Sequence, residues 1–314
     1  MASATVPARI HLLLCCETTT DAALGIGIRG KLQYNGYLTV IQGKFCMHSL
    51  LLPLLAMVAY AVAAGTVLNR LFHPAGPALK LTFSAACLGL VLHAIHLSAA
   101  LFTAEGQNFS LLNVSSLVSW LITMAVTLTA LRSPLILLLP VVYGVAALLQ
   151  LGVLVLPQGT QLVKIDQSPM LLLHILVAFI AYVILILATL YSVQVSYISY
   201  KLKHKALSMT SQLPPLMQAE VLQFRLLLIG TLLLGITLLS GALFTGDWFA
   251  KHNLHKNVLS LLAFGVFALL SWGHARLGWR GKTAISLTLL GSILLTLAYF
   301  GSRFVREVLL NGGF

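Results

Sequence analysis

Charged residues are scarce in this chain, and their scarcity decides its class. Asp, Glu, Lys and Arg make up 8% of the 314 residues, hydrophobic residues make up 59%, and the mean hydropathy is +0.97. An ordinary soluble domain carries about 25% charged residues. The composition therefore excludes a soluble domain and predicts an all-α, polytopic membrane helix bundle.

Acidic residues are rarer still. The chain has seven, and all of them fall in loops or at the ends of apolar segments: Glu17, Asp21, Glu105, Asp166, Glu220, Asp247 and Glu307. Carriers coupled to protons or cations usually place carboxylates inside the membrane, where these form the relay or the ion site. The lack of such carboxylates argues against a transporter.

The sequence also lacks the motifs of redox proteins and soluble enzymes. Its four cysteines, Cys15, Cys16, Cys46 and Cys87, form no CxxC pair, no CxxCH haem-attachment site and no disulfide framework. No P-loop, GxSxG or HExxH motif occurs, so we expect no such enzyme chemistry. The formal net charge of +12 comes from basic residues in short loops, which is typical of a protein whose partner is the lipid bilayer and not nucleic acid.

Apolar runs long enough to cross a bilayer begin at Leu50. About 20 residues are needed to cross roughly 30 Å of hydrocarbon. We predict eight spans, at Leu50–Leu68, Leu79–Leu101, Leu111–Leu131, Leu135–Leu156, Met170–Tyr197, Val221–Phe244, Val258–Gly273 and Ala284–Phe304. Residues 1–46 contain no such run, so we expect a poorly structured N-terminal extension, followed by one transmembrane domain over residues 47–310.

Basic residues differ between alternate loops and predict the orientation. One set of loops carries Arg70, Lys80, Arg132, Lys201, Lys203, Lys205, Arg276, Arg280 and Lys282; the other carries Lys164, Lys251, Lys256, Arg303 and Arg306. Lys and Arg collect on the cytoplasmic side. The loop 201–220 is therefore expected in the cytoplasm and the loops 102–109, 157–168 and 245–256 on the outer face.

Histidines supply most of the ionisable groups in the predicted spans. His93 and His96 are three residues apart and so share one helix face, while His174 lies near the outer end of the fifth span. His274 lies towards the cytoplasm. Neutral imidazole binds haem iron and transition metals. The alternative, that each histidine bonds a backbone carbonyl or a hydroxyl on a neighbouring helix, stays open for each of them.

Three short motifs follow one another in the C-terminal segment 269–302. They are His274, the sequence GWRG at 278–281 and the sequence YFG at 299–301. This segment resembles the C-terminal core of the CcsA-type cytochrome c assembly proteins. The segment PMLLLHILVAFIAY at 169–182, which contains His174 and Tyr182, is similar to a histidine-containing span of that family.

Other segments resemble the YpjD and HemX branch of the same superfamily. These are HAI at 93–95 and GQNFSLLNVSSLVSW at 106–120, and the similarity to YpjD-type inner-membrane proteins extends over most of residues 47–310. The resemblance implies a multi-pass protein of the bacterial inner membrane with a part in cytochrome c-type biogenesis. It also implies haem as a cofactor and a membrane protein partner in haem delivery or cytochrome maturation.

Two features of the haem-attaching members are reduced or missing. The external loop keeps only Gly246, Asp247 and Trp248 of a tryptophan-rich signature, and the segment after the last span has no histidine. We therefore expect haem binding or handling at the outer face without covalent attachment. A non-catalytic accessory subunit of another membrane complex, with structural histidines and a possible role in handling divalent cations, is the alternative that the reduced loop favours.

The expected site combines imidazoles for the haem iron with cations for its propionates. The residues expected to bind the cofactor are His93, His96, His174, His274, Lys251, Lys256 and Arg303. His93 or His96 pairs with His174 as axial ligands, which makes His93 and His174 the expected metal ligands. His274 lies near the other face, where it would serve haem on its way in.

Overall fold

A computed structural model describes most of the chain from Asn35 onward. The described residues are 35–70, 78–103, 106–131, 137–156, 159, 162–163, 169–203, 216–244 and 254–305, with side chains from Leu50. The chain divides into two compact units, Met1–His48 and Ser49–Phe314. The elements below belong to the second unit, apart from the first turns of α2.

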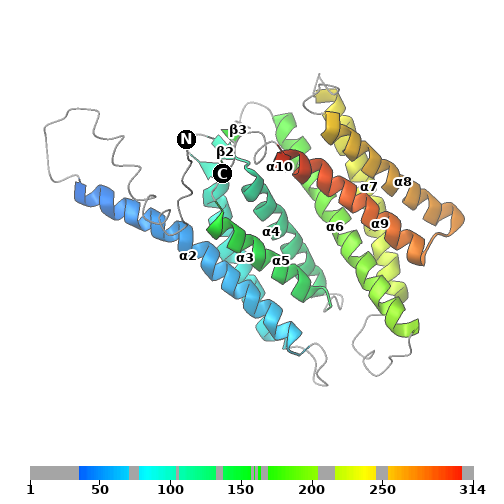
Figure 1. The fold of residues 1–314 in the computed structure, drawn as a ribbon, viewed down its shortest axis with the longest axis horizontal. Coiled ribbons are helices and arrows are strands. Elements are labelled where there is room, and N and C mark those ends of the chain that lie inside the picture. Colours follow the sequence, from blue (N-terminus) through cyan, green and yellow to red (C-terminus); the bar gives the residue numbers. More distant parts are fainter. Residues whose placement is uncertain are drawn as a thin grey trace, which may run out of the picture. The chain divides into compact units, whose positions relative to one another are not determined.

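The described part of the chain is almost entirely helical (Figure 1). The helices are α2 (Asn35–Leu68), α3 (Leu79–Leu101), α4 (Leu111–Ala130), α5 (Leu139–Val155), α6 (Pro169–Lys203), α7 (Leu216–Phe244), α8 (Leu254–Leu277), α9 (Gly281–Thr296), the π-helix η3 (Leu297–Gly301) and α10 (Ser302–Phe304). This confirms the all-α bundle predicted from composition and apolar runs.

Seven of these helical segments are long and apolar enough to cross a membrane within the described ranges. The first runs over Leu50–Leu68, as predicted, and the α9–η3–α10 segment counts as one, over Gly281–Phe304. The fourth predicted span, Leu135–Leu156, corresponds to α5, which has 17 residues. At 1.5 Å per residue such a helix is about 25 Å long, slightly shorter than the roughly 30 Å of hydrocarbon.

Part of the N-terminal extension lies within the described residues. Residues 35–46, expected to be poorly structured, are helical and continue into the first span as part of α2. The apolar stretch Tyr37–Ile41 and the absence of proline between Asn35 and Pro53 are compatible with a helix that begins before Met47. Residues 1–34, the rest of that extension, lie outside the described residues.

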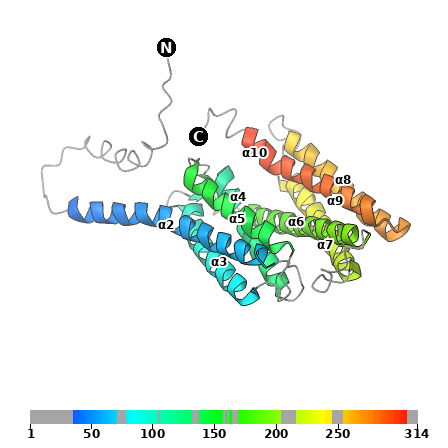
Figure 2. The ribbon, with the colours of Figure 1, turned by 60° about the horizontal axis from the view of Figure 1, so that its bottom comes forward.

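The buried apolar residues of the second unit form two main clusters. One joins α2, α3, α4 and α5 and includes Tyr60, Val126 and Tyr143. The other joins α6, α7, α8 and α9 and includes Leu185, Phe267 and Leu270. Helix α6 contributes to both clusters, packs most extensively against α7, and therefore connects the two groups of helices, while α8 and α9 lie side by side (Figure 1 and Figure 2).

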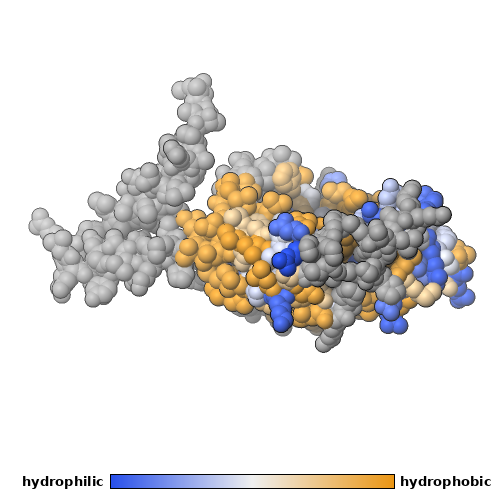
Figure 3. Space-filling model, turned by 90° about the horizontal axis from the view of Figure 1, so that it is seen from below, coloured by the Kyte–Doolittle hydropathy of each residue, from blue (hydrophilic) through white to orange (hydrophobic). Residues whose placement is uncertain are grey.

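Large apolar side chains also cover the outside of the bundle. Leu243 is 80% exposed, Val155 71% and Leu239 67%, although each lies within a helix. The face shown in Figure 3 is correspondingly hydrophobic over much of its described surface. In water such a surface would be costly, but in hydrocarbon it is the expected one, because lipid tails are as apolar as leucine.

A small antiparallel sheet lies at one end of α3 and α4. It has the order β1-β2-β3, with strands β1 (Phe102–Thr103), β2 (Gly106–Asn108) and β3 (Leu162–Val163). Asn113 ties α4 to this end of the molecule by donating to the carbonyls of Ala100 and Asn108. The sheet brings together two of the loops that were predicted to lie on one face of the membrane.

Candidate functional site

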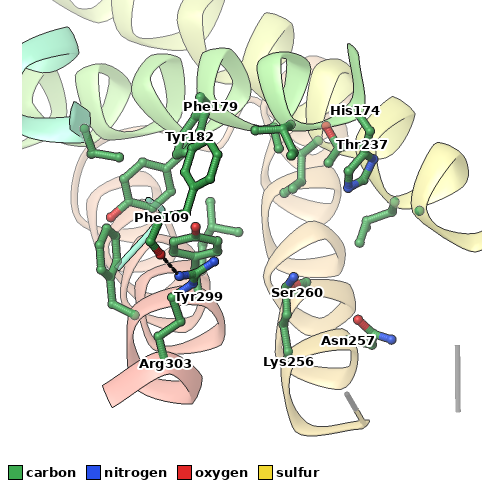
Figure 4. A pocket seen from close by; sticks show the side chains of 18 of the residues that line it. Phe109, His174, Phe179, Tyr182, Thr237, Lys256, Asn257, Ser260, Tyr299 and Arg303 are labelled. Carbon is green, nitrogen blue, oxygen red and sulfur yellow. Dashed lines mark hydrogen bonds between the residues drawn. The ribbon is translucent and has the colours of Figure 1, made fainter. Parts of the chain in front are cut away.

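A cavity of about 370 Å³ lies among α6, α7, α8 and the segment from α9 to α10 (Figure 4). Its wall is mainly apolar and aromatic, with a few polar side chains. The aromatic lining residues are Phe109, Phe179, Tyr182, Tyr299 and Phe300, and the ionisable ones are His174, Lys256 and Arg303. Three of the seven site residues predicted from the sequence therefore line one cavity.

His174 is held in a single tautomer by its neighbour on α7. The Ser240 hydroxyl donates its one hydrogen to the Thr237 carbonyl at 3.0 Å. The 2.8 Å contact between His174 Nδ1 and Ser240 Oγ must therefore be a donation from Nδ1–H. In the neutral ring this leaves Nε2 with a free lone pair, and Nε2 makes no hydrogen bond to any described residue.

Two cations flank the ring of Tyr299. Lys256 Nζ lies 5.8 Å from the ring centroid and Arg303 Cζ lies 5.3 Å from it. Figure 4 shows Arg303 and Tyr299 on one side of the cavity and Lys256 on α8 across from them. Arg303 also donates through Nη1 to the carbonyl of Phe109, which precedes α4. The cavity thus has a basic side built from elements that are distant in sequence.

The π-helix sets the direction of the aromatic residues in the last span. It covers Leu297–Gly301 and contains Tyr299 and Phe300, which line the cavity. Across from it, the Tyr182 hydroxyl lies 3.0 Å from Thr296 Oγ1, which itself donates to the Ser292 carbonyl. Tyr182 must therefore donate, which fixes its ring. Tyr182, Tyr299 and Phe300 belong to sequence motifs shared with the family, but their spacing in the sequence did not predict that they line one site.

His274 occupies a separate position, in the last turn of α8. Its Nδ1 donates to the Trp279 carbonyl at 3.0 Å, and its ring stacks on Phe224 with centroids 3.4 Å apart. The pair Arg280 and Glu220, with Nε and Oε1 3.7 Å apart, joins this turn to the start of α7. His274 therefore has the same tautomer as His174, but it does not line the cavity.

His93 and His96 lie in the other group of helices. Both are buried, and neither lines the cavity. His93 Nδ1 lies 3.2 Å from the Tyr60 hydroxyl and Nε2 lies 2.8 Å from Ser116 Oγ. Both of its ring nitrogens thus have partners inside the protein, so the structure does not bring His93 together with His174.

The remaining predicted residue, Lys251, lies outside the described residues. Over the described ranges, no group of three or more His, Cys, Asp or Glu side chains is placed to hold a metal ion. The arrangement can instead offer one imidazole nitrogen, aromatic faces and two cations to a single ligand.

Most of the chain matches a known protein family. Residues 81–310 match the model of a family described as cytochrome C assembly protein. The chain belongs to the cytochrome c assembly protein family. No solved structure matches it.

The chain is also similar to the inner membrane protein YpjD of Escherichia coli K12. The two are 38% identical over 258 residues, which cover 82% of this chain and 98% of YpjD. The YpjD protein of the O157:H7 strain has the same identity and coverage. An uncharacterized 28.8 kDa protein of Azospirillum brasilense is 35% identical over 144 residues, 44% of this chain and 52% of that protein. The chain is a multi-pass inner-membrane protein.

The GWRG sequence at 278–281 has a clear structural role. Gly278 and Gly281 have φ angles of +67° and +60°, which favour glycine. The turn between them folds the Trp279 ring onto Gly273, where an added Cβ would lie 2.3 Å from the ring. The turn also brings the Trp279 carbonyl to His274. The motif therefore positions one imidazole.

Proposed function

We propose that this protein binds a haem-type tetrapyrrole in the cavity between α6, α7, α8 and η3, at the outer face of the membrane. The observation that carries the proposal is His174, whose Nδ1–H is bonded to Ser240 while Nε2 keeps its lone pair in an aromatic cavity. Metal-binding histidines typically donate a hydrogen bond from their other ring N–H to an acceptor in the protein, which fixes the ring and raises its basicity.

The cavity residues fit this group in three respects. The volume of about 370 Å³ lies within the range of roughly 300–1,000 Å³ that is common for small-molecule pockets. Aromatic side chains such as Phe179 and Tyr182 provide surfaces for a flat macrocycle. Lys256 and Arg303 are cations at its side, where carboxylates can bind them.

The sparse donor set favours a metal that arrives with its own ligands. A protein site for a bare transition metal ion needs about three or four protein ligands. A tetrapyrrole supplies four nitrogens, so one or two imidazoles are enough. This supports a haem-type ligand over the divalent-cation alternative, since His174 is the imidazole that lines the cavity.

Within such a complex the chain's own residues bind and orient the ligand. His174 would hold the iron, Tyr299 and Phe300 would pack against the macrocycle, and Lys256 and Arg303 would hold its carboxylates. The haem would supply an iron centre for ligand exchange or electron transfer. Neither His93 nor His96, the predicted second axial ligands, lines this cavity, so His174 would be the one imidazole from this cavity to bind the iron. His274 has the same tautomer, and we propose that it serves haem on its way in, nearer the cytoplasmic face.

The role proposed for the site is to bind or handle haem, without covalent attachment, on behalf of a membrane partner in cytochrome maturation. The test is the absorbance spectrum of protein purified gently from haem-replete cells. A Soret band is expected in the wild type and in His255→Ala, a matched control because His255 is an exposed histidine one residue from Lys256. His174→Ala should lose or shift the band.

Two results contradict this proposal. One is a colourless wild-type protein that takes up no added hemin, and the other is an unaltered band in His174→Ala. If His174→Ala changes thermal stability alone, the histidines are structural and the accessory-subunit hypothesis is the better one.

A further inference from the structure

The second histidine site lies on α2, α3 and α4, and none of its residues lines the cavity. His93 on α3 is completely buried and sits between two hydroxyls, Tyr60 on α2 at 3.2 Å from Nδ1 and Ser116 on α4 at 2.8 Å from Nε2. Neither hydroxyl makes another hydrogen bond within the described part of the chain. Each can therefore act as donor or as acceptor.

This arrangement allows the proton of the neutral His93 ring to sit on either nitrogen. In one state Tyr60 donates to Nδ1 and Nε2–H donates to Ser116; in the other, Ser116 donates to Nε2 and Nδ1–H donates to Tyr60. One hydroxyl hydrogen is left over in each state, on Ser116 in the first and on Tyr60 in the second. His174 and His274 differ, because a serine that already donates and a carbonyl fix one state for each of them.

Other buried polar atoms in the same helices also lack partners. They are His96 Nδ1 on α3, Thr123 Oγ1 on α4, and both Oε1 and Nε2 of Gln150 on α5. A buried polar group without a hydrogen bond costs about 1–3 kcal/mol, so such groups normally have one. In a membrane-embedded bundle the partner must come from inside the protein.

Two of these residues lie at one height in the bundle. Helices α4 and α5 run antiparallel and meet where the Tyr143 hydroxyl lies 3.1 Å from Thr127 Oγ1. Seven residues further along α5 from Tyr143, Gln150 is level with the part of α4 between Ser119 and Thr123. Three atoms without partners thus lie within about one helical turn. A water molecule needs two to four such partners.

We propose that helices α2 to α5 enclose an internal water-binding site in which His93 relays protons between Tyr60 and Ser116. Water is the ligand, and it bonds the polar atoms of Gln150 and Thr123. Histidine is suited to this role because it can accept a proton on one ring nitrogen while it releases one from the other.

The relay step conserves protons and changes no oxidation state. The Ser116 hydroxyl hydrogen moves to Nε2, and a water molecule replaces it on Ser116. The Nδ1 hydrogen moves to the Tyr60 oxygen, whose own hydrogen passes to a second water. One proton has then crossed the ring, and water is both its source and its acceptor.

The relay is tested by solid-state NMR on ¹⁵N-histidine protein in liposomes. The signals of His93 are identified as those that are missing from the spectrum of the His93→Gln variant. In the wild type both ring nitrogens should show exchange between protonated and bare shifts, and Tyr60→Phe should leave one fixed tautomer. His274 is the control in the same sample, because its Nδ1–H donates to a carbonyl and must show one tautomer. A single fixed tautomer at wild-type His93 would overturn the relay.

The water site is tested separately by X-ray hydroxyl-radical labelling, which modifies side chains beside bound water. Tyr60 and Phe267 are both completely buried in apolar clusters, but Tyr60 contacts His93, whereas Phe267 belongs to the cluster of α6 to α9. Tyr60 should label much faster than Phe267, and Gln150→Leu should reduce its rate severalfold. Equal, slow labelling of both residues in the wild type would show that the interior is dry. Neither result bears on the haem cavity, which contains none of these residues.

Discussion

At the scale of single residues, hydrogen-bond partners decide what each histidine can do. His174 contacts a serine that has already given its hydrogen to Thr237, so only one ring nitrogen remains for a ligand. His93 contacts two hydroxyls that have not done so. Identical side chains in one membrane domain thereby acquire different chemistry.

Removing the Ser240 hydroxyl should weaken haem binding, although the His174 imidazole that would bind the iron is still present. Ser240→Ala leaves Nδ1–H without its acceptor and frees the ring to turn. Loss of such a supporting contact typically lowers affinity about 10–100-fold. Hemin titration followed by absorbance measures the change, and Ser240→Thr, which keeps a hydroxyl, should restore most of the affinity. Equal affinities for wild type and Ser240→Ala would mean that Ser240 does not position the ligand.

The contact between Gly273 and Trp279 gives a stability prediction on α8. An added Cβ at Gly273 would lie 2.3 Å from the Trp279 ring, so Gly273→Ala must displace the ring and with it the carbonyl that holds His274. We expect a destabilisation of about 1–3 kcal/mol. Gly265→Ala on the same helix is the matched control, because nothing lies within 4 Å of its Cβ position and the helix gains roughly 0.5–1 kcal/mol.

Thermal unfolding in detergent, followed by tryptophan fluorescence, distinguishes the two glycine variants. The midpoint should fall in Gly273→Ala and should stay the same or rise in Gly265→Ala. An unchanged midpoint in Gly273→Ala would mean that Trp279 does not pack on Gly273.

Some of the residues that line the cavity could be predicted from the sequence, and others could not. His174, Lys256 and Arg303 were predicted to share one surface, because apolar run length and loop charge fix the height of each residue in the membrane, and the structure places them in one cavity. The same reasoning put His93 at that height but could not say which neighbours its helix faces. Lateral packing depends on side-chain fit between helices, which hydropathy does not encode.

At the scale of elements, the π-helix in the last span is the feature that shapes the cavity. A π-helical turn holds one residue more than an α-helical turn and is frequently found at functional sites. Its effect here is to turn Tyr299 and Phe300 to the cavity and to carry Arg303 to the Phe109 carbonyl. Hydropathy gives no sign of it, since the segment 281–304 looks like any apolar span.

Deleting one residue from this turn should abolish binding and leave the span intact. Without Leu297, an exposed residue, the segment can close as a regular α-helix, which turns every later side chain by about 100°. Tyr299, Phe300 and Arg303 then leave the cavity. Hemin uptake should be lost in the deletion variant and kept in Leu297→Ala, which preserves the register, while membrane fractionation shows both proteins in the membrane. Normal uptake by the deletion variant would contradict this role of η3.

At the scale of the whole molecule, the chain's orientation remains a prediction from its basic loops. Labelling with an impermeant maleimide in a cysteine-free variant checks it, with single cysteines placed at Gly159 and at Ser208. The first should react in intact cells and the second only after lysis, because Lys and Arg concentrate in the loops next to Ser208. Reaction of the Ser208 cysteine from outside would reverse the topology and move the cavity to the inner face.

The hydrogen bond between Arg303 and the Phe109 carbonyl has a consequence for how the protein is made. Its two partners are 194 residues apart, and the cavity wall contains residues from both ends of that interval. The chain must therefore be synthesised and inserted as far as Arg303 before the cavity is complete. No ligand bound there can guide the insertion of the early helices, so the bundle has to assemble empty and be loaded afterwards. Shortage of ligand in the cell should then leave the amount of inserted protein unchanged and lower only its loaded fraction.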